Sequence, residues 1–149
     1  MNGLKPLIII LGPTASGKTG LALDLAKRFD GELVNADSRQ IYKEMDIATN
    51  KTREADNLPI HLLDLVNPDE IFSLATYKAL ALQKIEAIQN RGKLPILVGG
   101  TGLYISSIVD NLDIPKAPPD EKLRAEFEKK KTEELEKEIS EIFVCLPEA

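Results

Sequence analysis

Short apolar runs recur along the chain, and each of them leads into a group of polar or glycine residues. Four of the runs contain the aliphatic and β-branched residues that favour strands: Leu7–Leu11, Glu32–Ala36, Ile60–Val66 and Leu94–Val98. The first run is apolar throughout, which is typical of a strand that is buried on both faces. The pattern therefore predicts four strands.

Between and after these runs, apolar residues recur every three or four positions, which predicts helices. The sets are Ala22, Leu25, Ala26 and Phe29, then Leu74, Tyr77, Ala81, Ile85 and Ile88, and finally Leu103, Tyr104 and Ile108. Ser73 is a candidate N-cap for the second helix, which we expect to end near Arg91-Gly92. Strands that alternate with helices favour an α/β fold, in which a parallel sheet carries helices on both faces.

Beyond Asp110 the composition changes. Asn111–Pro119 contains three prolines and is expected to be a linker. Asp120–Glu141 is mostly charged, and we interpret it either as a solvated helix that packs lightly on a neighbour or as an unstructured tail. Its narrow apolar stripe consists of Leu123, Phe127, Leu135 and Ile139. Ile142–Leu146 is either a fifth strand or the end of a helix. We therefore divide the chain into a core at residues 1–111 and a linker with a charged helix at residues 112–149.

The composition narrows the possible classes of protein. A chain of 149 residues is long enough for one domain with a sizeable core. The formal net charge of −5 provides no general positive field, so a nucleic-acid partner would need a local basic patch. Cys145 is the only cysteine, which excludes an internal disulfide and favours a reducing compartment. We find no signal-peptide pattern and no apolar stretch of membrane-spanning length, and expect a cytoplasmic protein that contacts no membrane.

The segment after the first strand matches the pattern G-x-x-x-x-G-K-[ST] at every defined position. Its residues are Gly12, Pro13, Thr14, Ala15, Ser16, Gly17, Lys18 and Thr19. Between a strand and a helix, backbone N–H groups of such a loop surround phosphate oxygens, and the helix N-terminus adds partial positive charge. Lys18 would reach the outer phosphates, and the Thr19 hydroxyl would ligate Mg²⁺. The alternative is a glycine turn that only joins strand to helix.

A second polar segment, Asp37–Gln40, follows the strand Glu32–Ala36 and is expected at the same edge of the sheet. Asp37 could accept a proton from a nucleophile or hold a Mg²⁺-bound water. Asp37 or Ser38 could equally cap a short helical turn, which would leave the Asp37 carboxylate free to react. Arg39 could be an ordinary surface residue.

A third polar segment, Gly99–Gly102, follows the strand Leu94–Val98. Thr101 could hydrogen-bond a phosphate or a nucleophile, or it could cap the helix that follows. His61 is the only histidine, and its apolar strand favours a satisfied core or edge histidine over a catalytic one. We find no cysteine–histidine cluster that would indicate zinc.

Several motifs together resemble the N-terminal half of the tRNA dimethylallyltransferase family, which is also called the isopentenyltransferase family. They are Gly12–Thr19, Ala36–Tyr42, Met45–Ile47, His61–Asp64, Pro68–Glu70 and Leu97–Tyr104. The resemblance extends from about Pro6 to Phe127, with the motifs in order, and it implies a P-loop kinase-like fold. The glycine loop alone does not separate this family from small-molecule kinases, but the second and last motifs are far more specific to it.

In this family the donor is dimethylallyl diphosphate, and the acceptor is N6 of the adenosine 3′ to the tRNA anticodon. The resemblance implies that Lys18, with Mg²⁺ on Thr19, offsets charge on the leaving diphosphate, and that Asp37 accepts the N6 proton. It places Thr101 near the attacking amine. The residues it implies as contacts to the tRNA anticodon stem-loop are Asp37, Ser38, Arg39, Gln40, Thr101 and, further along, Arg124.

Three functions follow from the sequence. The first is prenyl transfer to tRNA. The second is a kinase for a small molecule or nucleotide, with ATP as donor and Asp37 as base. The third is a module that binds diphosphate without catalysis. Because members of the resembled family are longer, we expect a truncated, monomeric form with weak catalysis and weak tRNA binding.

Overall fold

The computed structural model describes residues 6–46, 54–55, 58–115 and 120–144. Of these, residues 54–55 and 142–144 are described in backbone only. The chain forms two compact units, Met1–Pro115 and Lys116–Ala149. The division between Pro115 and Lys116 falls a few residues beyond the one that the sequence indicates, between residues 111 and 112.

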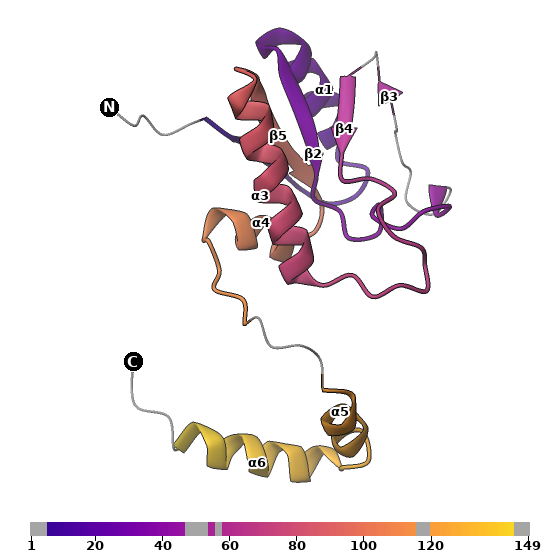
Figure 1. Ribbon diagram of the computed structural model, residues 1–149, viewed down its shortest axis with the longest axis vertical. Helices are drawn as coiled ribbons and strands as arrows, with labels where there is room; N and C mark the ends of the chain where they lie inside the picture. The colour runs from indigo at the N-terminus through magenta and orange to yellow at the C-terminus, as the bar shows by residue number, and fades with distance from the viewer. Residues whose placement is uncertain (1–5, 47–53, 56–57, 116–119, 145–149) are drawn as a thin grey trace. The chain divides into compact units, whose positions relative to one another are not determined.

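The first unit is built on one sheet with the strand order β1-β5-β2-β4-β3 (Figure 1). The strands are β1 (Ile8–Leu11), β2 (Gly31–Asn35), β3 (Glu54–Ala55), β4 (Leu58–His61) and β5 (Leu94–Gly99). β1, β5, β2 and β4 are parallel, as the alternation of strands and helices predicted. The short β3 pairs antiparallel with β4 and was not predicted.

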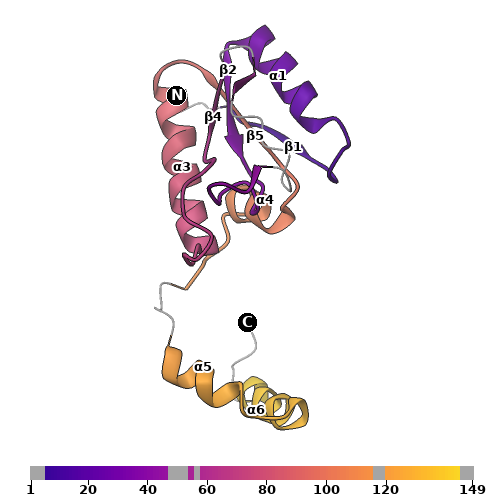
Figure 2. The ribbon, with the colours of Figure 1, turned by 90° about the vertical axis from the view of Figure 1, so that its right-hand side faces the viewer.

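Helices cover both faces of this sheet (Figures 1 and 2). α1 (Lys18–Phe29) lies on one face, while α3 (Leu74–Asn90) and α4 (Gly102–Val109) lie on the other. Alternate residues of the central strands supply the two cores, because successive side chains of a strand point to opposite faces. Leu33 packs in the core with α1, and Val34 packs in the core with α3 and α4. The predicted fold class is therefore confirmed.

The best-defined helix, α3, begins and ends where its sequence predicts. The Ser73 side chain accepts a hydrogen bond from the Thr76 amide at 3.1 Å, which satisfies one unpaired N–H of the first turn. Gly92 follows with a φ of +77°, a conformation that glycine adopts without strain. The predicted face lies on the sheet, and its buried members are Tyr77, Ala81, Ile85 and Ile88.

The strand expected at Ile60–Val66 is shorter and begins earlier, at Leu58, so this prediction was partly wrong. β4 ends at His61 because Leu62 and Asp64 have φ values of +64° and +53°, which no strand can continue. The chain then runs beside the segment that follows β2. There the Leu65 amide donates to the Ile41 carbonyl at 2.7 Å. The apolar run is thus divided between two locations.

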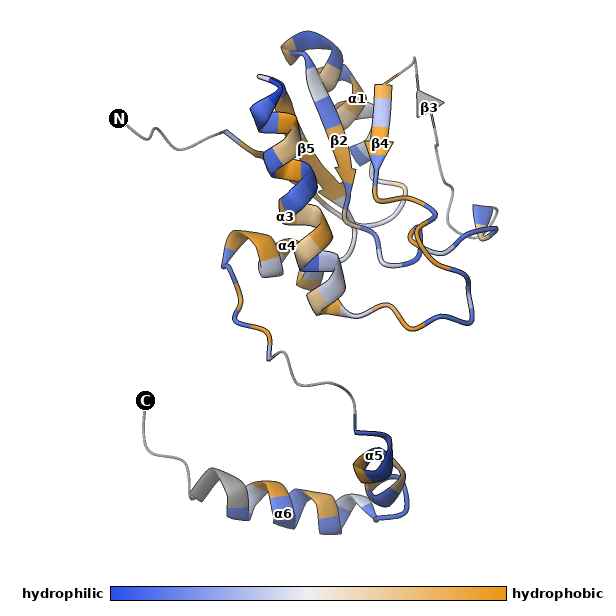
Figure 3. Cartoon of the chain, in the orientation of Figure 1, coloured by the Kyte–Doolittle hydropathy of each residue, from blue (hydrophilic) through white to orange (hydrophobic). Residues whose placement is uncertain are grey.

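The second unit contains two helices, α5 (Glu121–Phe127) and α6 (Thr132–Val144). Of the two interpretations of this segment, the helical one is therefore correct, with two helices in place of one, and the unstructured tail is wrong for the described residues. Asp120 caps α5 by accepting from the amides of Lys122 and Leu123, both at 3.0 Å. Lys130, between the helices, donates to the Glu138 carboxylate at 2.8 Å. Charged and apolar residues alternate along both helices, whereas β4 and β5 are largely apolar (Figure 3).

α6 also decides between the two interpretations of Ile142–Leu146. Residues 142–144 are helical, so the strand interpretation is wrong for them and the helix-end interpretation is correct. Cys145 and Leu146 lie outside the described residues. Among the helices that are described, none is both long and apolar enough to cross a membrane.

Candidate active site

The glycine loop Gly12–Thr19 joins β1 to α1 at the carboxyl end of the sheet. Gly17 occupies the N-cap position of α1 with a φ of +83°, in the left-handed region that glycine tolerates. In the described part of the chain no side chain caps this helix. The first N–H groups of α1 are therefore available to a bound anion, and the helix dipole favours negative charge there.

Lys18 folds back over this loop. Its ammonium group donates to the Pro13 carbonyl at 2.6 Å. This bond holds the cation beside the first turn of α1, where it can reach an anion on the loop. The Thr19 side chain lies in the same cavity.

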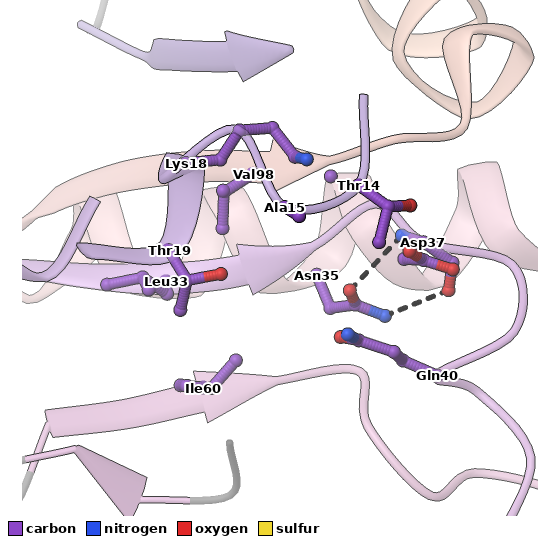
Figure 4. A pocket seen from close by; sticks show the side chains of 11 residues that line it. Thr14, Ala15, Lys18, Thr19, Leu33, Asn35, Asp37, Gln40, Ile60 and Val98 are labelled. Atoms are coloured by element: carbon purple, nitrogen blue, oxygen red, sulfur yellow. Dashed lines mark hydrogen bonds between the residues drawn. The ribbon is translucent and has the colours of Figure 1, made fainter. Parts of the chain in front are cut away.

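A cavity of about 90 Å³ connects the loop to the Asp37 segment. Lys18 and Thr19 lie at one side, and Asp37 and Gln40 lie at the other (Figure 4). Apolar side chains from three strands form part of the wall. The full lining is Thr14, Ala15, Lys18, Thr19, Leu33, Asn35, Asp37, Gln40, Ile60, Val98 and Gly99. The charged side chains of Lys18 and Asp37 and the apolar side chains therefore line the same cavity.

Asp37 opens a tight turn, and its carboxylate is only partly used by that turn. Asp37 Oδ1 accepts from the Arg39 amide at 2.9 Å, and the Gln40 amide donates to the Asp37 carbonyl at 3.2 Å. Asp37 Oδ2 lies toward Gly100, 3.9 Å from where a Cβ on that residue would stand. The capping and chemical interpretations of Asp37 are therefore compatible, because each can use a different oxygen.

Thr101 connects the third polar segment to the second. Its hydroxyl accepts from the Ser38 amide at 2.9 Å and donates to the Ser38 hydroxyl at 3.2 Å. Thr101 occupies the N-cap position of α4, as the cap interpretation held, but its hydroxyl bonds to Ser38 and makes no cap hydrogen bond to α4. A second hollow here is lined by Pro13, Thr14, Asp37, Ser38, Arg39, Gly100 and Thr101.

Sequence reasoning did not single out Asn35, which is buried at the end of β2. Its amide donates to the carbonyls of Asp37 at 3.2 Å and Leu62 at 3.1 Å, and its oxygen accepts from the Asp37 amide at 3.1 Å. The signal that could have identified it is an amide side chain at the carboxyl end of an otherwise apolar strand. A buried polar side chain needs hydrogen-bond partners, and two of the three partners of Asn35 are backbone groups of Asp37.

Two tyrosines support the same region from the α3 and α4 side. Tyr77 and Tyr104 stack with ring centroids 3.8 Å apart. Burial raises the pKa of both phenols, and the nearby Tyr42 and Asp37 raise that of Tyr104 further. Both phenols therefore stay neutral near pH 7 and can donate hydrogen bonds. Tyr77 donates to the Asn35 carbonyl at 3.0 Å.

His61 belongs to a separate ion-pair cluster centred on Glu32, in agreement with the core-or-edge interpretation. The buried Glu32 carboxylate lies 2.7 Å from His61 Nε2, 2.7 Å from an Arg91 nitrogen and 3.5 Å from Lys93 Nζ. Burial alone would raise the pKa of Glu32, but the hydrogen bonds and charges of His61 and Arg91 outweigh it and lower this pKa. His61 does not line the cavity.

The structure thus brings together the loop, Asp37, Ser38, Arg39, Gln40 and Thr101, which the sequence analysis selected. Arg124 lies exposed on α5 in the second unit, so its part in the site stays a prediction. Among the described residues no group of three or more His, Cys, Asp or Glu side chains could hold a metal ion.

The parallel sheet, the glycine loop and the carboxylate at its edge define a P-loop α/β protein. Residues 40–144 match the family model described as IPP transferase, and the chain belongs to that family. It is 50% identical over 131 residues to a tRNA dimethylallyltransferase of Roseiflexus castenholzii, covering 87% of this chain and 43% of that protein. A Staphylococcus aureus tRNA dimethylallyltransferase is 51% identical over 117 residues, covering 76% and 38% respectively.

Solved structures agree in fold. The full-length tRNA isopentenylpyrophosphate transferase from Bacillus halodurans superposes with a TM-score of 0.73 at 41% identity, covering 93% of this chain and 48% of that one. A eukaryotic dimethylallyltransferase acting on tRNA gives a TM-score of 0.72 at 35% identity, with 80% and 31% covered. The chain spans less than half the length of these relatives.

Proposed function

We propose that this chain carries the donor site and the proton acceptor of a tRNA dimethylallyltransferase. The observation that carries the proposal is the single cavity that joins the phosphate-binding loop to Asp37 along an apolar wall. Leu33, Ile60 and Val98 provide that wall, on the side of the cavity where Lys18 and Thr19 lie (Figure 4). An allylic diphosphate needs both kinds of surface, a charged one for its diphosphate and an apolar one for its hydrocarbon tail.

The reaction proposed here forms one bond and breaks another. The N6 lone pair of the adenosine 3′ to the anticodon attacks the first carbon of the dimethylallyl group, and the carbon–oxygen bond breaks with its electron pair on the diphosphate. Lys18 and the N–H groups at the start of α1 offset the charge that develops there. The carboxylate of Asp37 accepts the proton that N6 loses.

Mg²⁺ fits the residues present at the loop. The Thr19 hydroxyl lies in the cavity, and Mg²⁺ in phosphate sites is commonly held by one or two protein oxygens together with phosphate oxygens and waters. Bound there, it would supply further positive charge to the leaving diphosphate. Thr19 is the protein ligand that we propose for it.

The acceptor side of the proposal rests on the second hollow, beside Asp37. Ser38, Arg39 and Thr101 present two hydroxyls and an exposed guanidinium there, next to the carboxylate. The acceptor adenine must leave its stack to reach Asp37, as base-modifying enzymes require. We therefore propose the tRNA anticodon stem-loop as partner, with Gln40 and Arg124 as further contacts. We also propose that the protein acts in the cytoplasm as a monomer.

The test is to incubate the chain with Mg²⁺, labelled dimethylallyl diphosphate and an anticodon stem-loop RNA. We expect label on N6 of the adenosine 3′ to the anticodon and on no other nucleotide. A parallel reaction with γ-labelled ATP examines the kinase alternative. Phosphoryl transfer in that reaction, or donor binding without any prenyl transfer, would replace the proposal by the kinase or by the binding module.

A further inference from the structure

The Asn35 side chain makes two hydrogen bonds to the backbone of Asp37. Its Oδ1 accepts from the Asp37 amide at 3.1 Å, and its Nδ2 donates to the Asp37 carbonyl at 3.2 Å. The other partner of Nδ2 is the Leu62 carbonyl at 3.1 Å. One partner is an N–H donor and two are carbonyl acceptors, so only one orientation of the amide satisfies all three.

The Asn35 backbone is held as well. The Tyr77 hydroxyl donates to the Asn35 carbonyl at 3.0 Å, and the Tyr77 side chain is fully buried in α3. The ring of Tyr77 stacks on Tyr104 of α4 at a centroid distance of 3.8 Å. Asn35 is therefore connected to the α3–α4 layer on one side and to the Asp37 turn on the other.

The third bond connects the turn to the place where β4 breaks. Leu62, directly after the end of β4, has a φ of +64°, and its carbonyl accepts from the Asn35 amide. The Asp37 turn is thereby tied to β4 as well as to its own strand. A further hydrogen bond at this turn does not involve Asn35: the Arg39 amide donates to Asp37 Oδ1 at 2.9 Å. This bond depends on the orientation of the Asp37 carboxylate.

We propose that Asn35 is a positioning residue for Asp37, and that Tyr77 assists it by fixing the Asn35 backbone. The proposal rests on the proposed function, in which Asp37 accepts the proton. The Asn35 side chain lines the cavity, but its amide group bonds to the backbones of Asp37 and Leu62, and the role proposed for it acts through Asp37. By holding the turn, it keeps Asp37 Oδ2 directed toward Gly100 and the second hollow.

The experiment compares Asn35→Ala and Tyr77→Phe with the control Ser107→Ala in the full 149-residue chain. Ser107 is also buried, but its hydroxyl donates to the Tyr104 carbonyl at 2.7 Å, within α4. Its loss therefore removes a buried hydrogen bond without contacting Asn35 or Asp37. Tyr77→Phe is the milder test, because it removes one hydroxyl and keeps the ring stack.

The first readout is the rate of amide hydrogen exchange at Arg39, measured by NMR. The Arg39 amide donates to the Asp37 carboxylate and not to Asn35, so its exchange rate reports how well the carboxylate is held in place. We expect exchange at Arg39 to be at least tenfold faster in Asn35→Ala than in Ser107→Ala when both are compared at equal global stability. Tyr77→Phe should give a smaller change in the same direction. Equal exchange in Asn35→Ala and the control would overturn the proposal.

The second readout separates catalysis from binding. We expect kcat for prenyl transfer to fall at least tenfold in Asn35→Ala while KM for dimethylallyl diphosphate stays within about twofold. A loss confined to KM would contradict a positioning role. If the unmodified chain transfers no prenyl group, the proposed function fails, but the exchange measurement still decides whether Asn35 positions Asp37. If Asn35→Ala does not fold, Tyr77→Phe decides: exchange at Arg39 that is faster than in Ser107→Ala supports the proposal, and exchange equal to that of Ser107→Ala overturns it.

Discussion

Gly99 lies against the backbone of Ala36, and a Cβ on Gly99 would stand only 2.1 Å from the Ala36 carbonyl oxygen. No side chain fits at that distance. The same oxygen accepts from the Thr101 amide at 3.0 Å. The end of β5 is thereby joined to the residue that precedes Asp37, which places Thr101 beside the Asp37 turn.

We expect Gly99→Ala to lower the free energy of unfolding by about 3 kcal/mol or more, because the added methyl group meets backbone atoms that cannot move aside cheaply. Gly100→Ala is the matched control. Its Cβ would lie 3.5 Å from the Gly12 carbonyl oxygen, an ordinary contact, so we expect a change within about 1 kcal/mol. Urea unfolding followed by circular dichroism measures both. Equal losses in the two variants would contradict this account of the contact.

Glu32 predicts how stability depends on pH. Its pKa is lowered from 4.5 in the folded chain, so its ion pairs stabilise the fold fully above that value. This contribution is lost as the pH falls from about 4.5 through the folded pKa. We expect Glu32→Gln to cost about 1–3 kcal/mol near pH 7, because hydrogen bonds to charged partners disappear from a buried site.

The difference between wild type and Glu32→Gln should therefore shrink in acid, and unfolding curves from pH 7 to pH 3 measure it. Glu86→Gln, at an exposed position of α3, is the control and should leave the pH dependence unchanged. A difference that stays constant across this range would show that the Glu32 charge does not stabilise the fold.

Lys18→Ala tests the phosphate-binding loop. Loss of one charge-assisted hydrogen bond costs about 1.5–3 kcal/mol, so Mg²⁺-dependent affinity for dimethylallyl diphosphate should fall by about 10-fold to 150-fold. Isothermal titration calorimetry measures it, with Lys84→Ala on α3 as the control. Affinity like that of the wild type in Lys18→Ala would remove the loop from the proposed site.

Asp37→Asn tests the proton acceptor. We expect turnover to fall about 10²-fold to 10⁴-fold with little change in donor affinity, because an amide cannot accept the N6 proton. Asp24→Asn, at an exposed position of α1, is the control and should keep full turnover. If donor affinity collapses while turnover barely changes, Asp37 binds a metal ion or stabilises the fold and is not the base.

The sequence was sufficient for features that local patterns determine. The glycine loop, the face of α3 and the Ser73 cap all depend on residues close together in the chain. The predicted face of α1 is correct for Ala22 and Ala26, which are buried, and wrong for Phe29, which is 51% exposed. It was insufficient where contacts are distant: Asn35 bonds to Leu62, and Ala36 needs Gly99. No periodicity encodes such pairs.

The errors have similar physical causes. The run Ile60–Val66 is apolar enough for one long strand, but positive φ values at Leu62 and Asp64 end β4 and send the chain to a second location. In the charged segment, composition indicated one helix, but α5 and α6 are separate, and the residues between them make local contacts: the Lys131 amide donates to the Glu134 carboxylate at 3.0 Å, and Lys130 pairs with Glu126 and Glu138. The overall charge composition of the segment does not predict these individual side-chain contacts.

The central claim, that the cavity holds an allylic diphosphate, is tested most directly by comparing three ligands on the wild-type chain in the presence of Mg²⁺. The ligands are dimethylallyl diphosphate, inorganic diphosphate and ATP, measured by calorimetry. We expect dimethylallyl diphosphate to bind at least about fivefold more tightly than inorganic diphosphate, because burial of even part of its tail against Leu33, Ile60 and Val98 is worth about 1 kcal/mol. ATP should bind more weakly than dimethylallyl diphosphate. Tighter binding of ATP, or equal binding of the two diphosphates, would contradict the account.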